Sequence, residues 1–226
     1  MAATFSTTHA VMPEAETASE LKQFLFQQLM AQGLAETGRQ LCTFKQSDQV
    51  MSQVYTPPPR TILEVYQNLP EGTLAQLINN HIYMSPALTT SHQSVLLKIG
   101  TQLYDYVQKN NFGSVFIAPV DVYLNRKNAY QPDIIFIANA NIHKLQESGF
   151  YGAPDLVIEI LSPGTWRFDK VDKKDVYESS GVKEYWMVDP ADKTTEGFYL
   201  NANEYQPLLS QKGEITFKTL SLAITF

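Results

Sequence analysis

Two acidic residues in strongly apolar surroundings are the residues of this chain best placed to do chemistry. Asp133 opens the apolar segment Asp133–Ile137, and Glu159 lies in the middle of a second one, Asp155–Leu161. An ionised carboxylate inside such a segment is costly to bury unless a cation or hydrogen-bond donors compensate it. Two carboxylates on neighbouring strands, with a nearby lysine such as Lys173, are the groups that a magnesium-dependent phosphodiesterase needs.

Spacing decides which acids could share one metal ion. Mg²⁺ takes about six oxygen ligands at roughly 2.1 Å, usually one or two carboxylates plus waters and phosphate. Asp155 and Glu159 stand four residues apart on one strand, so their backbones are roughly 13 Å apart. Asp133 opens the preceding strand, and paired strands run only about 5 Å apart. The sequence therefore predicts that Asp133 and Glu159 hold Mg²⁺ or Mn²⁺, provided that their strands pair side by side.

Lys173 lies in a charged segment that reads as a helix over Arg167–Ser180. From there it could reach back to the carboxylates, position the attacking water or stabilise charge on a phosphate. Three simpler interpretations stay open. Glu159 could be a structural acid paired with Arg167 or Lys173, Asp133 could merely follow Pro132 in a turn, and Lys173 could belong to a solvated helix face.

The elements around these residues predict a mixed α+β fold. Apolar periodicity indicates a helix over Thr61–Asn68 and a long helix from Thr90 or Ser91 to Lys109. Leu156–Leu161 is apolar at nearly every position, which is typical of a central strand covered on both faces. We therefore expect a central mixed β-sheet flanked by helices. The other expected strands are two within Leu74–Ser85, then Ser114–Ala118, Asp121–Leu124, Glu184–Val188, Gly197–Leu200 and Ile215–Thr219.

The domain organisation follows from a stiff connector at Pro57-Pro58-Pro59. We expect residues 1–56 to be an N-terminal extension with one amphipathic helix over Thr17–Leu34, and residues 57–226 to be the main domain. The apolar face of that helix is the reason for expecting a homodimer.

Composition limits the partners and the location of the protein. The net charge is −6, from 17 basic and 23 acidic residues, so no strongly basic surface for a polyanion is expected. The single cysteine, Cys42, cannot form an internal disulfide, which favours a cytoplasmic protein. No apolar segment approaches the roughly 20 residues that cross a bilayer.

The same residues carry a family resemblance. It rests on Pro132-Asp133, on the run from Glu159 to Thr165, on Asp169, Lys173, Tyr177 and Gly181-Val182, and on the run from Glu184 to Pro190. This pattern resembles the restriction-endonuclease-like proteins of the Uma-two group, within the PD-(D/E)XK nuclease superfamily. The likeness covers about residues 62–189.

The resemblance implies a restriction-endonuclease-like core and a metal-dependent endonuclease acting on nucleic acid, with DNA the expected substrate. Asp133 and Glu159 would be metal ligands, and Lys173 would replace the superfamily lysine, whose usual position is Leu161 here. Gln76 stands where the family often has a glutamate, and His92 matches a histidine at the start of the long helix. Both join the candidate catalytic residues, and Glu64 and Glu71 are the possible substitutes for the missing glutamate.

Two other functions stay open. Because Gln76 brings no charge and the chain is acidic, the domain could be a catalytically impaired nucleic-acid or protein interaction module. An enzyme acting on a small phosphorylated ligand would also explain the absence of a basic run.

Overall fold

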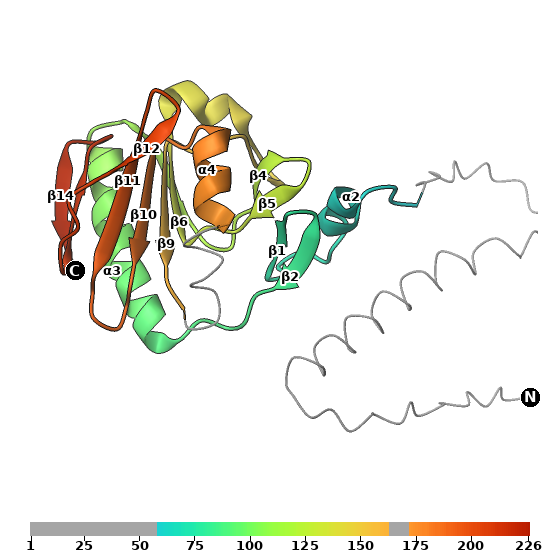
Figure 1. Cartoon of the computed structure of the whole chain (residues 1–226), viewed down its shortest axis with the longest axis horizontal. Coiled ribbons are helices and arrows are strands. Elements are labelled where there is room, and N and C mark those ends of the chain that lie inside the picture. Colours follow the sequence, from blue (N-terminus) through green and yellow to red (C-terminus); the bar gives the residue numbers. More distant parts are fainter. Residues whose placement is uncertain (1–57, 163–171) are drawn as a thin grey trace, which may run out of the picture. The chain divides into compact units, whose positions relative to one another are not determined.

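The computed structural model of the chain describes residues 58–162 and 172–226 (Figure 1). Residues 57–226 form one compact unit. The helix expected over Thr17–Leu34, and the first part of the helix expected over Arg167–Ser180 with Asp169, lie outside the described residues.

A mixed six-stranded sheet forms the centre of this unit. Its β9 and β10 run parallel, and the other neighbouring strands run antiparallel. The strand order is β12 (Glu204–Pro207), β11 (Thr195–Asn201), β10 (Glu184–Val188), β9 (Leu156–Ile160), β6 (Ile134–Ala138) and β3 (Gly113–Ile117).

A second six-stranded sheet, only partly expected from the sequence, stands beside the central one (Figure 1). Its order is β2 (His81–Met84), β1 (Ala75–Ile78), β5 (Asn128–Tyr130), β4 (Val122–Asn125), β8 (Gly149–Tyr151) and β7 (Leu145–Gln146). The remaining elements are α2 (Ile62–Gln67), α3 (Thr90–Lys109), the 3₁₀ helix η1 (Asn139–Lys144), α4 (Lys174–Ser180) and the hairpin β13 (Glu214–Phe217) with β14 (Leu222–Thr225).

Helices α3 and α4 cover opposite faces of the central sheet (Figure 1). All five residues of β9 are buried, and they alternate between the two faces. Ile158 and Ile160 pack with α3, whereas Val157 packs with Tyr177 of α4. The predicted central sheet flanked by helices is therefore confirmed, as is the coverage of this strand on both faces.

The register of β6 and β9 fixes the relation between the two candidate metal ligands. Ile134 pairs with Ile158, and Ile135 pairs with Val157, in an antiparallel ladder. One step further along the same ladder, Asp133 stands opposite Glu159. The strands that carry the two acids therefore run side by side, which is the condition that the metal prediction set.

Several predicted boundaries need correction. The N-cap of α3 is Thr89 rather than Thr90 or Ser91, because the Thr89 hydroxyl accepts the hydrogen bond from the His92 amide at 3.3 Å. Asp133 and Asp155 each precede their strands by one residue instead of opening them. The two strands expected within Leu74–Ser85 are present as β1 and β2, and they turn at Asn79-Asn80 with φ of 48° and 65°.

A buried carboxylate attaches the β13–β14 hairpin to the central sheet. Glu184 is fully buried at the start of β10. It accepts hydrogen bonds from the Trp186 indole at 2.8 Å and from the Lys218 and Thr219 amides at 2.9 and 2.6 Å.

We expect Glu184→Ala to lower the free energy of unfolding by about 2–4 kcal/mol, because the buried Trp186 indole and two partly buried amides would lose their acceptor. The measurement is urea denaturation followed by circular dichroism. The control is Glu204→Ala on exposed β12, for which we expect a change within about 0.5 kcal/mol. Equal stability of the two variants would contradict this role of Glu184.

Candidate active site

Asp133 is held by two donors that come from different parts of the fold. Its Oδ2 accepts a hydrogen bond from the Ile160 amide at 2.7 Å and lies 3.2 Å from His92 Nε2. Asp133 is 7% exposed and His92 only 2%. The Thr89 cap places His92 in the first turn of α3, so the start of the helix and the end of β9 together fix one oxygen of this carboxylate.

The charge of His92 depends on Asp133. Burial of the ring lowers the pKa of His92, but the hydrogen bond to Asp133 and the negative charge of that carboxylate raise it by more. The net effect is a raised pKa, which favours an imidazolium beside Asp133. Within the described part of the chain, the buried Nδ1 of His92 has no hydrogen-bond partner.

Glu159 is held by two side chains of the segment that forms α4. Lys173 Nζ donates to Oε1 at 2.9 Å, and the Tyr177 hydroxyl donates to the same oxygen at 2.7 Å. Lys173 is 2% exposed and Glu159 is 4% exposed. Lys173 thus lies buried against Glu159 and not on a solvated helix face, an arrangement that fits a structural ion pair as well as the predicted site.

Tyrosines enclose this ion pair. Tyr177 is fully buried, and burial together with the charge of Glu159 raises the pKa of its hydroxyl well above the ordinary value. The Tyr130 ring meets the Tyr177 ring edge-on at 5.5 Å, and Lys173 Nζ lies 5.7 Å from the Tyr130 centroid. Sequence reasoning gave Tyr177 no role. Its position four residues after Lys173, one helical turn away, was the available signal.

Gln76 lies beside the segment that leads into Asp133. Its Oε1 accepts a hydrogen bond from the Gln131 amide at 3.4 Å, and the Gln131 side chain donates to Asp121 at 2.9 Å. Glu71 is exposed, and Glu64 accepts from the Arg60 amide at the start of α2. Of the three candidates, Gln76 is the one that the structure brings next to the Asp133 segment.

The two carboxylates could act as ligands of a hard divalent cation, although they bring only two negative charges to it. Asp133 and Glu159 supply carboxylate oxygens, the ligand type that hard divalent cations prefer. Mg²⁺ is commonly held by one or two carboxylates with waters and phosphate. Among residues 58–162 and 172–226, no three His, Cys, Asp or Glu side chains gather closely enough to hold a metal by themselves. A cation held by Asp133 and Glu159 would therefore need water or substrate to complete its ligand set.

The mixed sheet with its two helices is that of a nuclease-fold protein. It is similar to a crystal structure from Anabaena variabilis ATCC 29413 described as a "putative nuclease belonging to DUF820", with a TM-score of 0.61 and 19% sequence identity. The match covers 74% of this chain and 95% of that chain.

The family follows from the sequence itself. Residues 63–225 match the model of the Uma2 family, described as "Putative restriction endonuclease", and the chain belongs to this family. The resemblance inferred from Asp133, Glu159 and the residues up to Pro190 is confirmed. No curated protein matches the chain.

In the described part, no helix is long and apolar enough to cross a membrane.

Asp155 has a different role from Asp133 and Glu159. It is 1% exposed and accepts hydrogen bonds from the Ala138 amide at 2.8 Å and from the Asn141 side chain, with Lys183 beside it. Burial raises the pKa of Asp155, but the bond to Lys183 and the Ala138 amide outweigh it and lower that pKa overall. Asp155 is a structural acid at the opposite end of β9 from Glu159.

We expect Asp155→Asn to lower the free energy of unfolding by about 1–3 kcal/mol at neutral pH. Because the folded-state pKa of Asp155 is lowered, its contribution is complete above the ordinary carboxyl pKa of about 4 and is lost as the pH falls through the folded value. Urea denaturation at several pH values should show the difference from wild type shrinking below about pH 4. The matched control is exposed Asp175→Asn, and a difference that grew on acidification would contradict this account.

Proposed function

We propose that the protein is a divalent-metal-dependent endonuclease that hydrolyses phosphodiester bonds in DNA. The observation that carries the proposal is the opposed pair Asp133 and Glu159, with the Lys173 ammonium 2.9 Å from the glutamate. Membership of the restriction-endonuclease family and the nuclease fold support the same reaction class.

Each residue of the site has a separate task in this proposal. Asp133 and Glu159 would hold Mg²⁺ or Mn²⁺, which when bound supplies a polarised water and neutralises charge on the phosphoryl group. Lys173 is a buried cation that can also donate to the attacking water or to a phosphoryl oxygen. His92 and Tyr177 restrict the two carboxylates, and Gln76 supports the segment that enters Asp133.

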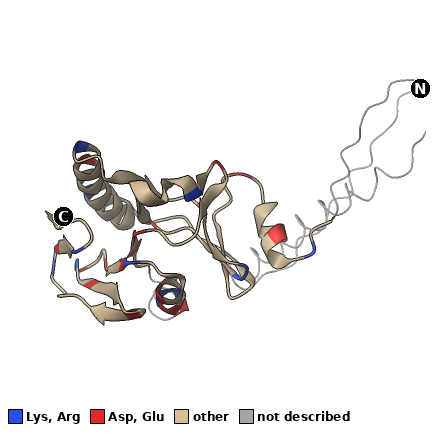
Figure 2. Ribbon diagram, turned by 90° about the horizontal axis from the view of Figure 1, so that it is seen from above, with Lys and Arg blue, Asp and Glu red and all other residues tan. Residues whose placement is uncertain are grey.

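The substrate has to approach an acidic protein. Figure 2 shows lysine, arginine, aspartate and glutamate scattered over the described elements, with no continuous basic stripe along any of them. Weak affinity for the phosphate backbone in the absence of metal follows from this distribution. Assembly into a homodimer, which is part of the proposal, would present two sites to one duplex. The single cysteine supports a proposed cytoplasmic location.

A second function is favoured by one feature of the same site. Gln76 is neutral, and the Lys173 ammonium already compensates Glu159. A domain that kept this ion pair for structural reasons could bind nucleic acid or protein without cutting. Metal binding separates the two functions, because an interaction module does not need Asp133 beside Glu159.

We expect wild-type protein to bind Mn²⁺ in isothermal titration calorimetry and to nick plasmid DNA when Mg²⁺ or Mn²⁺ is added. Asp133→Ala and Glu159→Ala should each abolish both properties, because each removes one of two carboxylate ligands. Asp155→Asn should retain both. Retention of Mn²⁺ binding by the Asp133 and Glu159 variants would contradict the assigned ligands, and absence of metal binding by wild type with or without DNA would favour the interaction module.

The neighbouring lysines provide a matched test of the catalytic cation. We expect Lys173→Met to lower the rate of DNA cleavage by about 10²-fold or more, because a preorganised charge near the phosphoryl group is lost. Lys174→Met, one residue further on, should cut at nearly the wild-type rate, because Lys174 lies over the Phe198 ring instead. Single-turnover cleavage at saturating Mg²⁺ measures both rates. Equal rates for the two variants would show that Lys173 takes no part in the reaction.

A further inference from the structure

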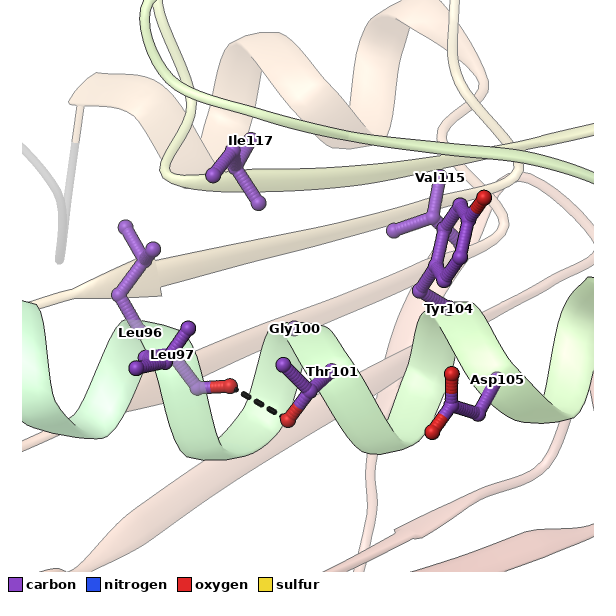
Figure 3. A pocket seen from close by; sticks show the side chains of 8 residues that line it. All are labelled: Leu96, Leu97, Gly100, Thr101, Tyr104, Asp105, Val115 and Ile117. Carbon is purple, nitrogen blue, oxygen red and sulfur yellow. Dashed lines mark hydrogen bonds between the residues drawn. The ribbon is translucent and has the colours of Figure 1, made fainter.

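An apolar groove lies on the side of the molecule where α3 meets the edge of the central sheet (Figure 3). Its volume is about 290 Å³, and the residues that line it include Leu97, Thr101, Tyr104, Val115 and Ile117, with Asp105 as its charged member. Leu97 is 62% exposed, and Tyr104 and Ile117 are each 50% exposed. These are large apolar side chains in a position where a solvated helix face would normally carry polar ones.

The strand below this groove is an open edge. β3 is the last strand of the central sheet and pairs only with β6. The Ala118 amide bonds to the Asp133 carbonyl, and the Asn139 amide bonds to the Phe112 carbonyl. Because hydrogen-bonding residues alternate along an antiparallel strand, Val115 and Ile117 direct their amides and carbonyls away from β6. The strand reads Gly-Ser-Val-Phe-Ile, without the charge or proline that usually protects an edge.

We propose that this surface is the interface with a second copy of the chain. In this arrangement β3 pairs antiparallel with the partner's β3 around Phe116, so that Val115 stands opposite the partner's Ile117. The two α3 helices then lie side by side on the same face of a continuous sheet. Thr101, an exposed residue between Leu97 and Tyr104 on α3, is small enough to let the helices approach closely.

Two charged residues next to the exposed apolar residues of α3 favour a second copy of the chain over an unrelated partner. Lys98 and Asp105 are exposed and stand seven residues apart, so they lie on the same side of α3. When two α3 helices pack antiparallel, Lys98 of each helix faces Asp105 of the other, and the pair occurs twice. The surface is thus complementary to itself in charge as well as in backbone hydrogen bonding.

The helix and the strand require the same two-fold axis. Gly100 lies against Ile117, since a Cβ there would be 3.4 Å from Ile117 Cγ2, and Tyr104 and Val115 line the same groove one helical turn further on (Figure 3). The midpoint between Lys98 and Asp105 therefore falls at the level of Phe116, about which the strands pair. One axis satisfies both sets of contacts.

This interface adds a surface to the homodimer named in the proposed function, and it does not depend on nuclease activity. The proposed interface adjoins the candidate active site. The Ala118 amide, which follows β3, donates to the Asp133 carbonyl, and α3 carries His92. Pairing at β3 would therefore stiffen both elements that hold Asp133.

Sedimentation velocity of the full-length protein over a range of concentrations tests the proposal. We expect wild type to sediment as a dimer and Ile117→Lys to sediment as a monomer. Lys98→Asp should raise the dimer dissociation constant by about 10-fold or more, because two attractive pairs become repulsive. The double variant Lys98→Asp/Asp105→Lys should restore the wild-type constant, since the charges are exchanged but remain complementary.

Two controls separate this surface from others. Leu209→Lys introduces the same charge at an exposed leucine elsewhere and should leave the dimer intact. Leu25→Lys tests whether the N-terminal segment is needed for association. A monomeric wild type, a dimer that survives Ile117→Lys, or a failure of the double variant to restore association would each overturn the proposal. Loss of the dimer in Leu25→Lys alone would assign the association to the N-terminal segment instead. Circular dichroism of each variant confirms that a monomer is folded.

Discussion

A slip of one residue in the antiparallel pairing of β6 with β9 would move Glu159 to the face covered by α3 and separate it from Asp133. The observed register places them opposite each other, with Glu159 on the face covered by α4. Close packing on both faces of these strands holds that register, because a slip of one residue would exchange side chains of different shape between the two covered faces and would take Glu159 away from Lys173 and Tyr177. The candidate site is thus a consequence of how the core packs.

The burial of two opposed carboxylates then dictates the surrounding residues. Their mutual repulsion and desolvation would be prohibitive without compensation, and each acid has its own partners. Asp133 has His92 and the Ile160 amide, and Glu159 has Lys173 and Tyr177. These partners come from both covering helices and from β9 itself, so the site is assembled only when both faces of the sheet are covered. Asp155 shows the alternative, a buried acid with protein donors and Lys183 around it and a purely structural role.

Residue types and short-range periodicity were enough to predict the central sheet and α3. They also suggested that Lys173 could reach the carboxylates, because it follows the strand of Glu159 on a short helix that packs back against the sheet. The second sheet was only partly predicted, since β5, β7 and β8 are two or three residues long and depend on distant partners. Tyr177 was missed because an aromatic residue on a helix is normally a core residue, and only the contact with Glu159 distinguishes it.

The central claim is that Asp133 and Glu159 hold one divalent cation between two strands. Anomalous diffraction from crystals of the protein soaked in Mn²⁺ tests it most directly. The account predicts one strong peak bound by carboxylate oxygens of both residues, absent from crystals of Glu159→Ala. Crystals of wild-type protein with no peak there, with or without bound DNA, and with Lys173 still paired to Glu159, would contradict it and leave the acids as structural residues.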